Sequence, residues 1–226
     1  MVDWDKRYRD GFYNGEMEPH ELLQKFWHVI PGKNVIDIAM GTGRNSIFLA
    51  KKGFCVYGLE RSAEAIHIAK EASETTGQAV SIVRGDASAI PFKDNSADCV
   101  LVFYFLLRDI MRNIPDILKK GGILIYETFL KRQNTVETYT ANTASRVPAC
   151  ECEKLHTAWP SEGTTPPMGE QAQVPETAHK RNPDYLLEDG ELISFFRNFD
   201  LLFYEETISL STNKRKATAK FIGRKR

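Results

Sequence analysis

Long apolar runs alternate with amphipathic stretches along the first 130 residues of the chain. The runs are continuous and rich in Val, Ile, Leu and Phe, which is typical of strands buried on both faces of a parallel sheet. The expected strands are 31–39, 54–60, 79–86, 97–107 and 123–130. Between them, apolar residues recur at helical spacing, so each strand is expected to be linked to the next by a covering segment.

Local signals mark the ends of the expected helices. The first helix begins between Thr42 and Asn45 and ends at two lysines followed by Gly53. Ser62 is suited to cap the second helix, and Gly77 to end it. The third, 108–122, is interrupted by a proline and closed by two glycines.

The pattern changes near the C-terminal end. A helix at 188–199 is followed by two strands, 200–210 and 216–226, which the turn sequence STNK joins. Two strands joined so closely form a hairpin, so the last strand is expected to run antiparallel to its neighbours. The whole pattern predicts an α/β fold: a Rossmann-like doubly wound, mostly parallel seven-stranded sheet with an antiparallel C-terminal hairpin strand.

Two regions stand outside this alternation. Residues 1–30 are expected to form an N-terminal helical cap, in which Trp4 and Tyr8 either close over a ligand or anchor the first helix. Residues 131–183 hold six of the ten prolines and little periodic apolar sequence, which is typical of a lid or a disordered insert. We therefore expect one domain, 1–226, elaborated by this cap and this insert.

Charge and hydropathy restrict the partners. Thirty basic residues balance thirty acidic ones, so no overall field favours nucleic acid or an anionic membrane. No run approaches the roughly 18 apolar residues that a membrane-spanning helix needs, and the N-terminal sequence shows no apolar signal segment. A cytoplasmic location is expected, and no pattern specifies an oligomeric state.

The four cysteines do not predict a metal site. Cys55 and Cys99 lie in apolar runs and are expected to be buried. Cys150 and Cys152, with His156 nearby, resemble half of a zinc site, but a second pair of ligands is missing from the neighbourhood. Exposed thiols are the simpler interpretation of this pair, and we expect no metal.

The sequence VIDIAMGTGRNS joins the first expected strand to its helix through a glycine loop. Such a loop presents backbone N–H groups and a helix N-terminus to an anionic ligand group. A dinucleotide site uses G-x-G-x-x-G, but Ser46 stands where the third glycine is expected. A dinucleotide, S-adenosylmethionine and a purely steric use of the glycines remain the alternatives for this loop alone.

The next two strand ends also carry carboxylates. Glu60 ends the second strand, seventeen residues after Gly43, where a carboxylate can accept from both hydroxyls of a ribose. Asp86 ends the third strand, where it can accept from an adenine amino group while Ala87 packs against the ring. Three successive strand ends therefore suit the parts of one adenosine ligand.

These segments resemble the class I S-adenosylmethionine-dependent methyltransferases. The matching stretches, in the family's order, are VIDIAMGTGRN, VYGLERS, GDASAIPFKDNSADCVLV and LKKGGILIYET, which cover roughly residues 34–130. The resemblance implies that S-adenosylmethionine is the cofactor and assigns its contacts. Those for the methionine moiety are Asp37, Ala39, Met40, Gly41 and Gly43; those for the ribose and adenine are Glu60, Arg61, Asp86 and Ala87; Phe103 and Tyr104 lie near the sulfonium.

Three more stretches, FYFLLRDI, YETFLKRQN and NPDYLLEDGELISFF, resemble the bacterial small-molecule enzymes often called tellurite-resistance-like. Two departures stand out. Ala39 replaces a customary glycine, which leaves the loop intact if its φ stays negative. The insert at 133–180 is longer than the family pattern, which affects the cover of the active site.

Methyl transfer from a sulfonium needs alignment of the reactants and exclusion of water more than it needs acid–base groups. The histidines are scattered along the sequence, as expected for such a reaction, and His179 is the one of interest. The expected catalytic residues on the acceptor side are Tyr104, Arg108 and Arg181, with Tyr126, Glu127 and Tyr185 as further candidates. The two arginines suit an anionic acceptor or, equally, pairing with Asp109 or Asp184. Glu127 suits a general base or a structural role.

The favoured function is methyl transfer to a small-molecule acceptor, which the sequence leaves open among a thiol, a chalcogen oxyanion, a carboxylate and a phenol. An NAD-dependent oxidoreductase is disfavoured by Ser46 and by the lack of a Tyr-x-x-x-Lys motif. A nucleic-acid methyltransferase is disfavoured because basic residues cluster only in the terminal hairpin and tail. A protein that binds the cofactor without transferring its methyl group is the fourth alternative.

Overall fold

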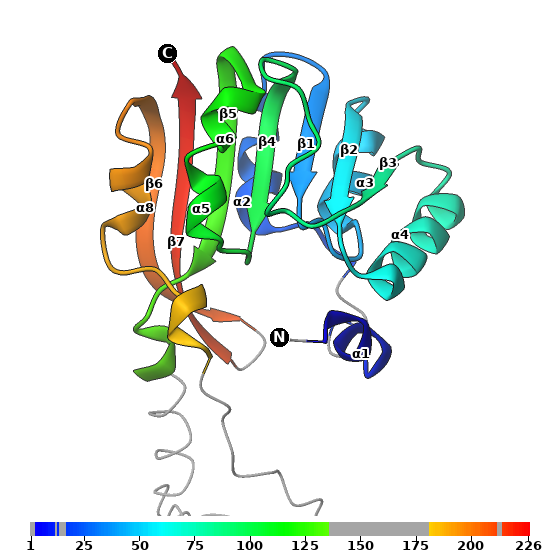
Figure 1. Ribbon diagram of the computed structural model, residues 1–226, viewed down its shortest axis with the longest axis horizontal. Coiled ribbons are helices and arrows are strands. Elements are labelled where there is room, and N and C mark those ends of the chain that lie inside the picture. Colours follow the sequence, from blue (N-terminus) through cyan, green and yellow to red (C-terminus); the bar gives the residue numbers. More distant parts are fainter. Residues whose placement is uncertain (1–2, 12, 14–16, 136–180, 212–213) are drawn as a thin grey trace, which may run out of the picture.

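The computed structural model describes residues 3–11, 13, 17–135, 181–211 and 214–226. Its strands form one seven-stranded sheet with the order β3-β2-β1-β4-β5-β7-β6. The strands are β1 (Asn34–Ile38), β2 (Cys55–Glu60), β3 (Ser81–Arg84), β4 (Ala97–Phe103), β5 (Leu118–Phe129), β6 (Phe199–Ser211) and β7 (Lys214–Lys225). β1 to β5 pair in parallel, whereas β7 is antiparallel to both β5 and β6. The predicted fold class and the antiparallel hairpin are confirmed (Figure 1).

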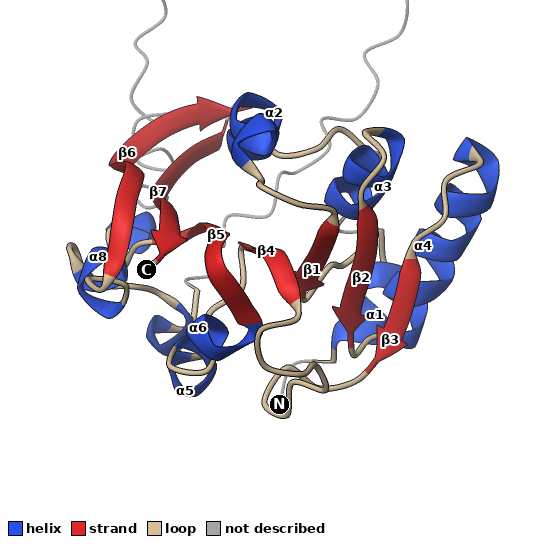
Figure 2. Cartoon of the chain, turned by 90° about the horizontal axis from the view of Figure 1, so that it is seen from above, coloured by secondary structure: helices blue, strands red, loops and turns tan. Residues whose placement is uncertain are grey.

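Helices cover both faces of the sheet. The helices are α1 (Trp4–Arg9), α2 (Glu21–Phe26), α3 (Arg44–Lys51), α4 (Ala63–Thr76), α5 (Arg108–Met111), α6 (Ile114–Ile117) and α8 (Glu191–Phe195), with the 3₁₀ helices η1 (Trp27–Val29) and η2 (Pro183–Tyr185). Figure 2 shows α2 and α3 on one face, and α5, α6 and α8 on the other. The apolar core is accordingly split into two layers, one on each face of the sheet.

Capping explains where the crossover helices begin and end. The Ser62 hydroxyl accepts a hydrogen bond from the Ala65 N–H at the start of α4, and Gly77 ends that helix in the left-handed conformation, as predicted. Gly43 precedes α3 in the same conformation. These caps turn the chain back toward the sheet, so the carboxyl ends of β1, β2 and β4 all point to one edge (Figure 1).

The single helix expected at 108–122 is wrong. The chain forms two short helices, α5 and α6, and enters β5 at Leu118. The pairing between β4 and β5 shifts between Ala97/Leu118 and Cys99/Ile123, and Gly121 lies in this irregularity with φ = 79°. The glycines therefore form a bulge in β5 instead of ending a helix.

Other boundaries differ less. β4 ends at Phe103 instead of continuing to 107, and α8 is shorter than the helix expected at 188–199. Cys99 is buried as expected, but Cys55 is exposed. It is the first residue of β2, where alternate side chains point to solvent before the helices cover the strand.

The N-terminal residues are partly helical, as expected, through α1, α2 and η1. Most of the predicted insert, 136–180, lies outside the described residues. The segments on either side of it are joined, because the Asn134 side chain accepts from the backbone N–H of Arg181 and donates to its carbonyl. Within the described part of the chain, no helix is long and apolar enough to cross a bilayer.

Candidate active site

The loop between β1 and α3 contains three residues in the left-handed conformation. Ala39 has φ = 56°, Gly41 φ = 59° and Gly43 φ = 78°. The condition of a negative φ at Ala39 is therefore not met, because the loop turns sharply at the residue that follows β1. A left-handed alanine is strained by about 1–2 kcal/mol, and such strain concentrates at functional sites.

Asp37 is buried beneath this loop. Its carboxylate accepts a hydrogen bond of 2.7 Å from the Ser46 hydroxyl, and burial raises its pKa from 3.8 to about 7. Ser46, which replaces the third glycine of a dinucleotide motif, thus orients the acidic group on the preceding strand. Sequence reasoning used Ser46 only as an exclusion and missed this contact.

Glu60 lies at the carboxyl end of β2, beside the glycine loop. Its carboxylate accepts from the backbone N–H groups of Gly41 at 3.0 Å, and of Arg61 and Ser62 at 2.8 Å each. Burial raises its pKa, while these bonds oppose the rise. The three bonds hold a buried acceptor at the position expected for a ribose-binding carboxylate.

The end of β3 lies next to that of β2. Arg61 and Asp86 form an ion pair of 3.2 Å across the two ends, and both side chains are about half exposed. Asp86 also accepts a hydrogen bond of 2.9 Å from the Ser88 N–H, which caps the turn that follows β3. The Ala87 side chain, next to Asp86, is buried and belongs to one layer of the apolar core.

Met40 points away from this site. Its side chain packs with Ile66 and Ala69. A Cβ atom at Gly58 would lie 2.0 Å from the Met40 sulfur, so the glycine in β2 is what gives this side chain its space. Only the backbone of Met40 is therefore available to a ligand in the glycine loop.

Helix α1 lies across the glycine loop and the start of α4 (Figure 1). The Asp5 carboxylate accepts from the Ser62 hydroxyl at 2.6 Å and from the Glu64 N–H at 3.3 Å. The Tyr8 hydroxyl is 2.9 Å from the position of a Cβ added at Gly41. Tyr8 therefore lies over the loop, while Asp5 anchors α1 to the start of α4.

A row of rings follows the ends of β4 and β5. His20 stacks on Phe103 at 4.5 Å between centroids and meets Tyr104 edge-on at 4.8 Å. Tyr104 in turn stacks on Phe129 at 4.6 Å, and the Arg181 guanidinium lies 3.9 Å above that ring. The structure thus brings Phe103, Tyr104 and Arg181 together, although Arg181 is 77 residues beyond Tyr104 in the chain.

His20 was not expected here. Its Nε2 atom accepts a hydrogen bond of 2.8 Å from the Arg44 guanidinium, and burial together with Arg44 and Lys216 lowers its pKa to about 2. It is therefore neutral and carries its proton on Nδ1. No local sequence pattern predicts this role, because Arg44 is 24 residues away from His20 and the two ring partners are at least 83 residues away.

Glu127 belongs to the wall of a pocket next to this row of rings. Its carboxylate accepts a hydrogen bond of 3.1 Å from the Tyr104 hydroxyl, and burial raises its pKa although Lys220 opposes the shift. Tyr104 itself is left-handed, with φ = 52°, and its N–H donates to the Glu127 carbonyl at 2.7 Å. Backbone and side chain thus both join the end of β4 to β5.

The pocket has a volume of about 530 Å³ and lies between α2, the start of α3 and the β6–β7 hairpin. Arg44, which directly follows the glycine loop, and Tyr104, which follows β4, belong to its wall. The full wall comprises Glu18, Pro19, His20, Glu21, Leu22, Lys25, Phe26, Arg44, Tyr104, Glu127, Phe203, Glu205, Ser209, Lys216 and Lys220. The pocket is therefore continuous with the edge of the expected cofactor site.

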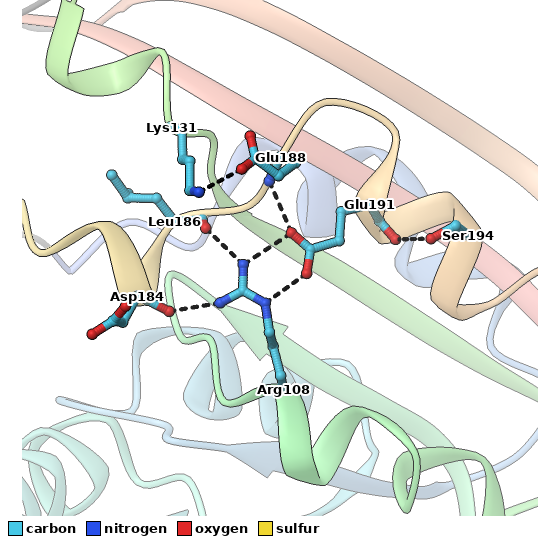
Figure 3. A network of polar contacts seen from close by, with 7 residues as sticks. All are labelled: Arg108, Lys131, Asp184, Leu186, Glu188, Glu191 and Ser194. Carbon is cyan, nitrogen blue, oxygen red and sulfur yellow. Dashed lines mark hydrogen bonds and ion pairs between the residues drawn. The ribbon is translucent and has the colours of Figure 1, made fainter.

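Arg108 binds protein groups instead of facing this pocket. Its guanidinium donates to both carboxylate oxygens of Glu191, at 2.6 and 2.9 Å, and to the carbonyls of Asp184 and Leu186 (Figure 3). An ion pair between Lys131 and Glu188 joins the same segment to the chain that follows β5. These contacts favour a structural role, in which Arg108 fastens the chain that follows Arg181.

The other acceptor-side candidates divide. Tyr126 is fully buried, and its hydroxyl donates to the Phe105 carbonyl, so it belongs to the core. Tyr185 is 54% exposed and lies on the surface. His179, Cys150, Cys152 and His156 lie outside the described residues, and the described ones contain no cluster of three or more metal-ligating side chains.

Comparisons with known proteins agree with this geometry. Residues 35–122 match a family model described as a methyltransferase domain. The chain is 32% identical over 106 residues to a demethylmenaquinone methyltransferase of Renibacterium salmoninarum, which covers 44% of this chain and 43% of that protein. It is 36% identical over 76 residues to ribosomal RNA small subunit methyltransferase J of Bdellovibrio bacteriovorus, covering 33% and 30%. The chain thus spans about half or less of the length of these curated relatives.

Among solved structures, TehB from Haemophilus influenzae is similar with a TM-score of 0.65 and 16% identity, over 98% of this chain and 67% of that one. At this identity the likeness shows the fold alone. The family match and the curated relatives show that residues 35–122 resemble a methyltransferase domain. The order of the sheet agrees with the class I methyltransferase fold expected from the sequence, whose cofactor is S-adenosylmethionine.

Proposed function

We propose that the protein transfers the methyl group of S-adenosylmethionine to a small molecule bound in the pocket beside Tyr104. The observation that carries this proposal is the continuity of two sites. Arg44 and Tyr104, at the ends of the glycine loop and of β4, belong to the wall of a pocket of about 530 Å³. A ligand in the loop and a ligand in the pocket would therefore meet at these residues.

The residues at the strand ends fit the cofactor. Glu60 has both carboxylate oxygens directed by backbone N–H groups, and a carboxylate has about four acceptor positions, so one remains for a ligand hydroxyl. Asp86 and the buried Ala87 stand where the adenine is expected, and the left-handed residues of the glycine loop open its backbone to the methionine moiety. When bound, the cofactor supplies a methyl group on a positively charged sulfur.

The protein's part in such a transfer is to align the reactants and exclude water. Tyr8 covers the glycine loop, and His20 covers Phe103, so rings enclose the approach from both sides. Tyr104 and Arg181 remain our proposed acceptor-side residues, whereas the contacts of Arg108 assign it to the support of that segment.

The acceptor class is a proposal. One relative is named for demethylmenaquinone and another for ribosomal RNA, so the names alone favour neither class of acceptor. The balanced net charge and the size of the pocket support a small molecule. A cytoplasmic location is likewise proposed, since the described helices include no membrane-spanning one.

The test is release of S-adenosylhomocysteine from S-adenosylmethionine by the purified protein, in the presence of phenols, thiols, carboxylates, chalcogen oxyanions and ribosomal RNA in parallel. We expect turnover with one of the small-molecule classes. Turnover with RNA alone would replace the acceptor class. Binding of NADH without binding of S-adenosylmethionine would overturn the proposed function.

A further inference from the structure

Four ring-bearing side chains and one buried carboxylate line the pocket. The rings belong to His20, Phe26, Tyr104 and Phe203, which come from three separate parts of the chain. Glu127 is only 6% exposed and yet belongs to the pocket wall. Charged side chains make up the larger part of the rest of the wall: Glu18, Glu21, Lys25, Arg44, Glu205, Lys216 and Lys220. The rings suit a planar ligand, and the buried Glu127 carboxylate suits a proton donor on that ligand.

The charges around Glu127 are arranged across the sheet. Glu127 on β5 is directly opposite Lys220 on β7, which is opposite Glu205 on β6. The Lys220 ammonium binds Glu205 at 2.8 Å, and Lys220 and Lys216 both favour the ionised form of the Glu127 carboxylate. The Glu127 carboxylate accepts a hydrogen bond of 3.1 Å from the Tyr104 hydroxyl.

Position gives Glu127 access to a reacting group. Tyr104 follows Phe103 at the end of β4, where the resemblance places the sulfonium, and its hydroxyl touches the Glu127 carboxylate. A nucleophile bound between Tyr104 and the cofactor would therefore lie within reach of this carboxylate. Methyl transfer to a neutral hydroxyl produces a proton, and a positioned base removes it.

We propose that the acceptor is a hydroxylated aromatic ring held among Phe26, Tyr104 and Phe203, and that the Glu127 carboxylate takes the proton of its hydroxyl group. This inference rests on the methyl transfer proposed above. In the step, the O–H bond breaks and its proton moves to a Glu127 oxygen, while the acceptor oxygen forms a bond to the methyl carbon. The bond between that carbon and sulfur breaks, and its electron pair stays on sulfur as a neutral thioether.

Two acceptors of the same shape test the role of Glu127. 2-Naphthol keeps its proton near neutral pH, whereas 2-naphthalenethiol is largely ionised and needs no base. We expect Glu127→Gln to lower the rate with 2-naphthol about 100-fold or more, which is the usual contribution of a general base, and to leave the rate with the thiol nearly unchanged. The control variant Glu71→Gln removes an exposed carboxylate on α4 that does not belong to the pocket wall, so we expect it to leave both rates unchanged.

The pH profile adds a second readout. The rate with 2-naphthol should rise with pH as Glu127 ionises, and this rise should be missing in Glu127→Gln. Tyr104→Phe removes the hydrogen bond that stabilises the carboxylate form, so the rise should move to higher pH. A purely structural role of either residue would leave the shape of the profile unchanged.

The outcomes separate this inference from the proposed function. Equal losses with both acceptors in Glu127→Gln would overturn the base. Absence of turnover with both acceptors by a wild-type protein that binds S-adenosylmethionine would overturn the aromatic acceptor and leave the cofactor site standing. Failure of the wild-type protein to bind S-adenosylmethionine would instead overturn the proposed function itself.

Discussion

Glu60→Gln is the substitution that probes the cofactor site most sharply. The carboxylate accepts three backbone N–H bonds, one on Oε2 and two on Oε1. An amide replaces one of these acceptor oxygens by an NH₂ group, so at least one backbone N–H loses its partner. A buried unpaired donor costs about 1–3 kcal/mol, which relief from burying a charge offsets in part, so we expect about 1–2 kcal/mol lower stability at neutral pH.

Glu60→Gln is expected to change the affinity for the ligand more than it changes the stability. A hydrogen bond from a ligand hydroxyl to a charged group contributes about 1.5–3 kcal/mol, which corresponds to a rise of roughly 10- to 150-fold in Kd. Calorimetric titration with S-adenosylhomocysteine measures this rise, and urea denaturation measures the stability. Glu71→Gln, on the exposed face of α4, is the control and should change stability by less than about 0.5 kcal/mol. Unchanged affinity in a folded Glu60→Gln protein would refute the assignment of this carboxylate.

Three further substitutions test the strain, the buried acid and the clamp. Ala39→Gly should stabilise the protein by about 0.5–1 kcal/mol in urea denaturation, because relief of left-handed strain exceeds the added freedom of the unfolded chain; Ala50→Gly, the same change inside α3, should destabilise it by about 1 kcal/mol. Asp37 has its pKa raised from 3.8 to about 7 in the folded state, so this group stabilises the folded protein below pH 3.8. That stabilisation is lost as the pH rises through about 7. Asp37→Asn should lack this loss, which is on the order of 4 kcal/mol, and equal pH dependence in both proteins would contradict the shift. Arg108→Lys cannot bind Glu191 with two parallel bonds, so hydrogen exchange at residues 184–191 should become faster while α4 is unaffected; unchanged exchange would show that the clamp contributes nothing.

The sheet was predictable because each of its signals is local. Continuous apolar runs mark buried strands, and Ser62 and Gly77 mark the ends of α4 through contacts within four residues. The region 108–122 was not, because two glycines that are suited to ending a helix equally suit a bulge. The bulge depends on the pairing of β4 with β5, which no stretch of the sequence shows by itself.

The cofactor side of the site followed from the same logic. Carboxylates at the ends of consecutive parallel strands must meet at one edge, so spacing alone placed Glu60 and Asp86 near each other, and their contact with a cofactor stays a prediction. The conformation of Ala39 was not, because a glycine loop tolerates a left-handed alanine when the rest of the loop holds it. Met40 faces the core because Gly58, on the next strand, leaves room for its sulfur.

The acceptor side was predicted least well. His20 and Lys216 come from opposite ends of the chain and meet at Tyr104 only through the three-dimensional packing of α2 and β7. Arg108 and Arg181 look alike in the sequence, but one donates to Glu191 and the other covers Phe129. The sequence around each arginine does not distinguish these two environments, whereas the three-dimensional structure does.

The measurement that tests the central claim most directly is a crystal structure of the protein with S-adenosylhomocysteine bound. The account predicts a ribose hydroxyl on the Glu60 carboxylate, the adenine beside Ala87 and Asp86, and the sulfur directed toward Tyr104 and the pocket. A ligand bound elsewhere, or one whose sulfur faces away from Tyr104, would contradict it.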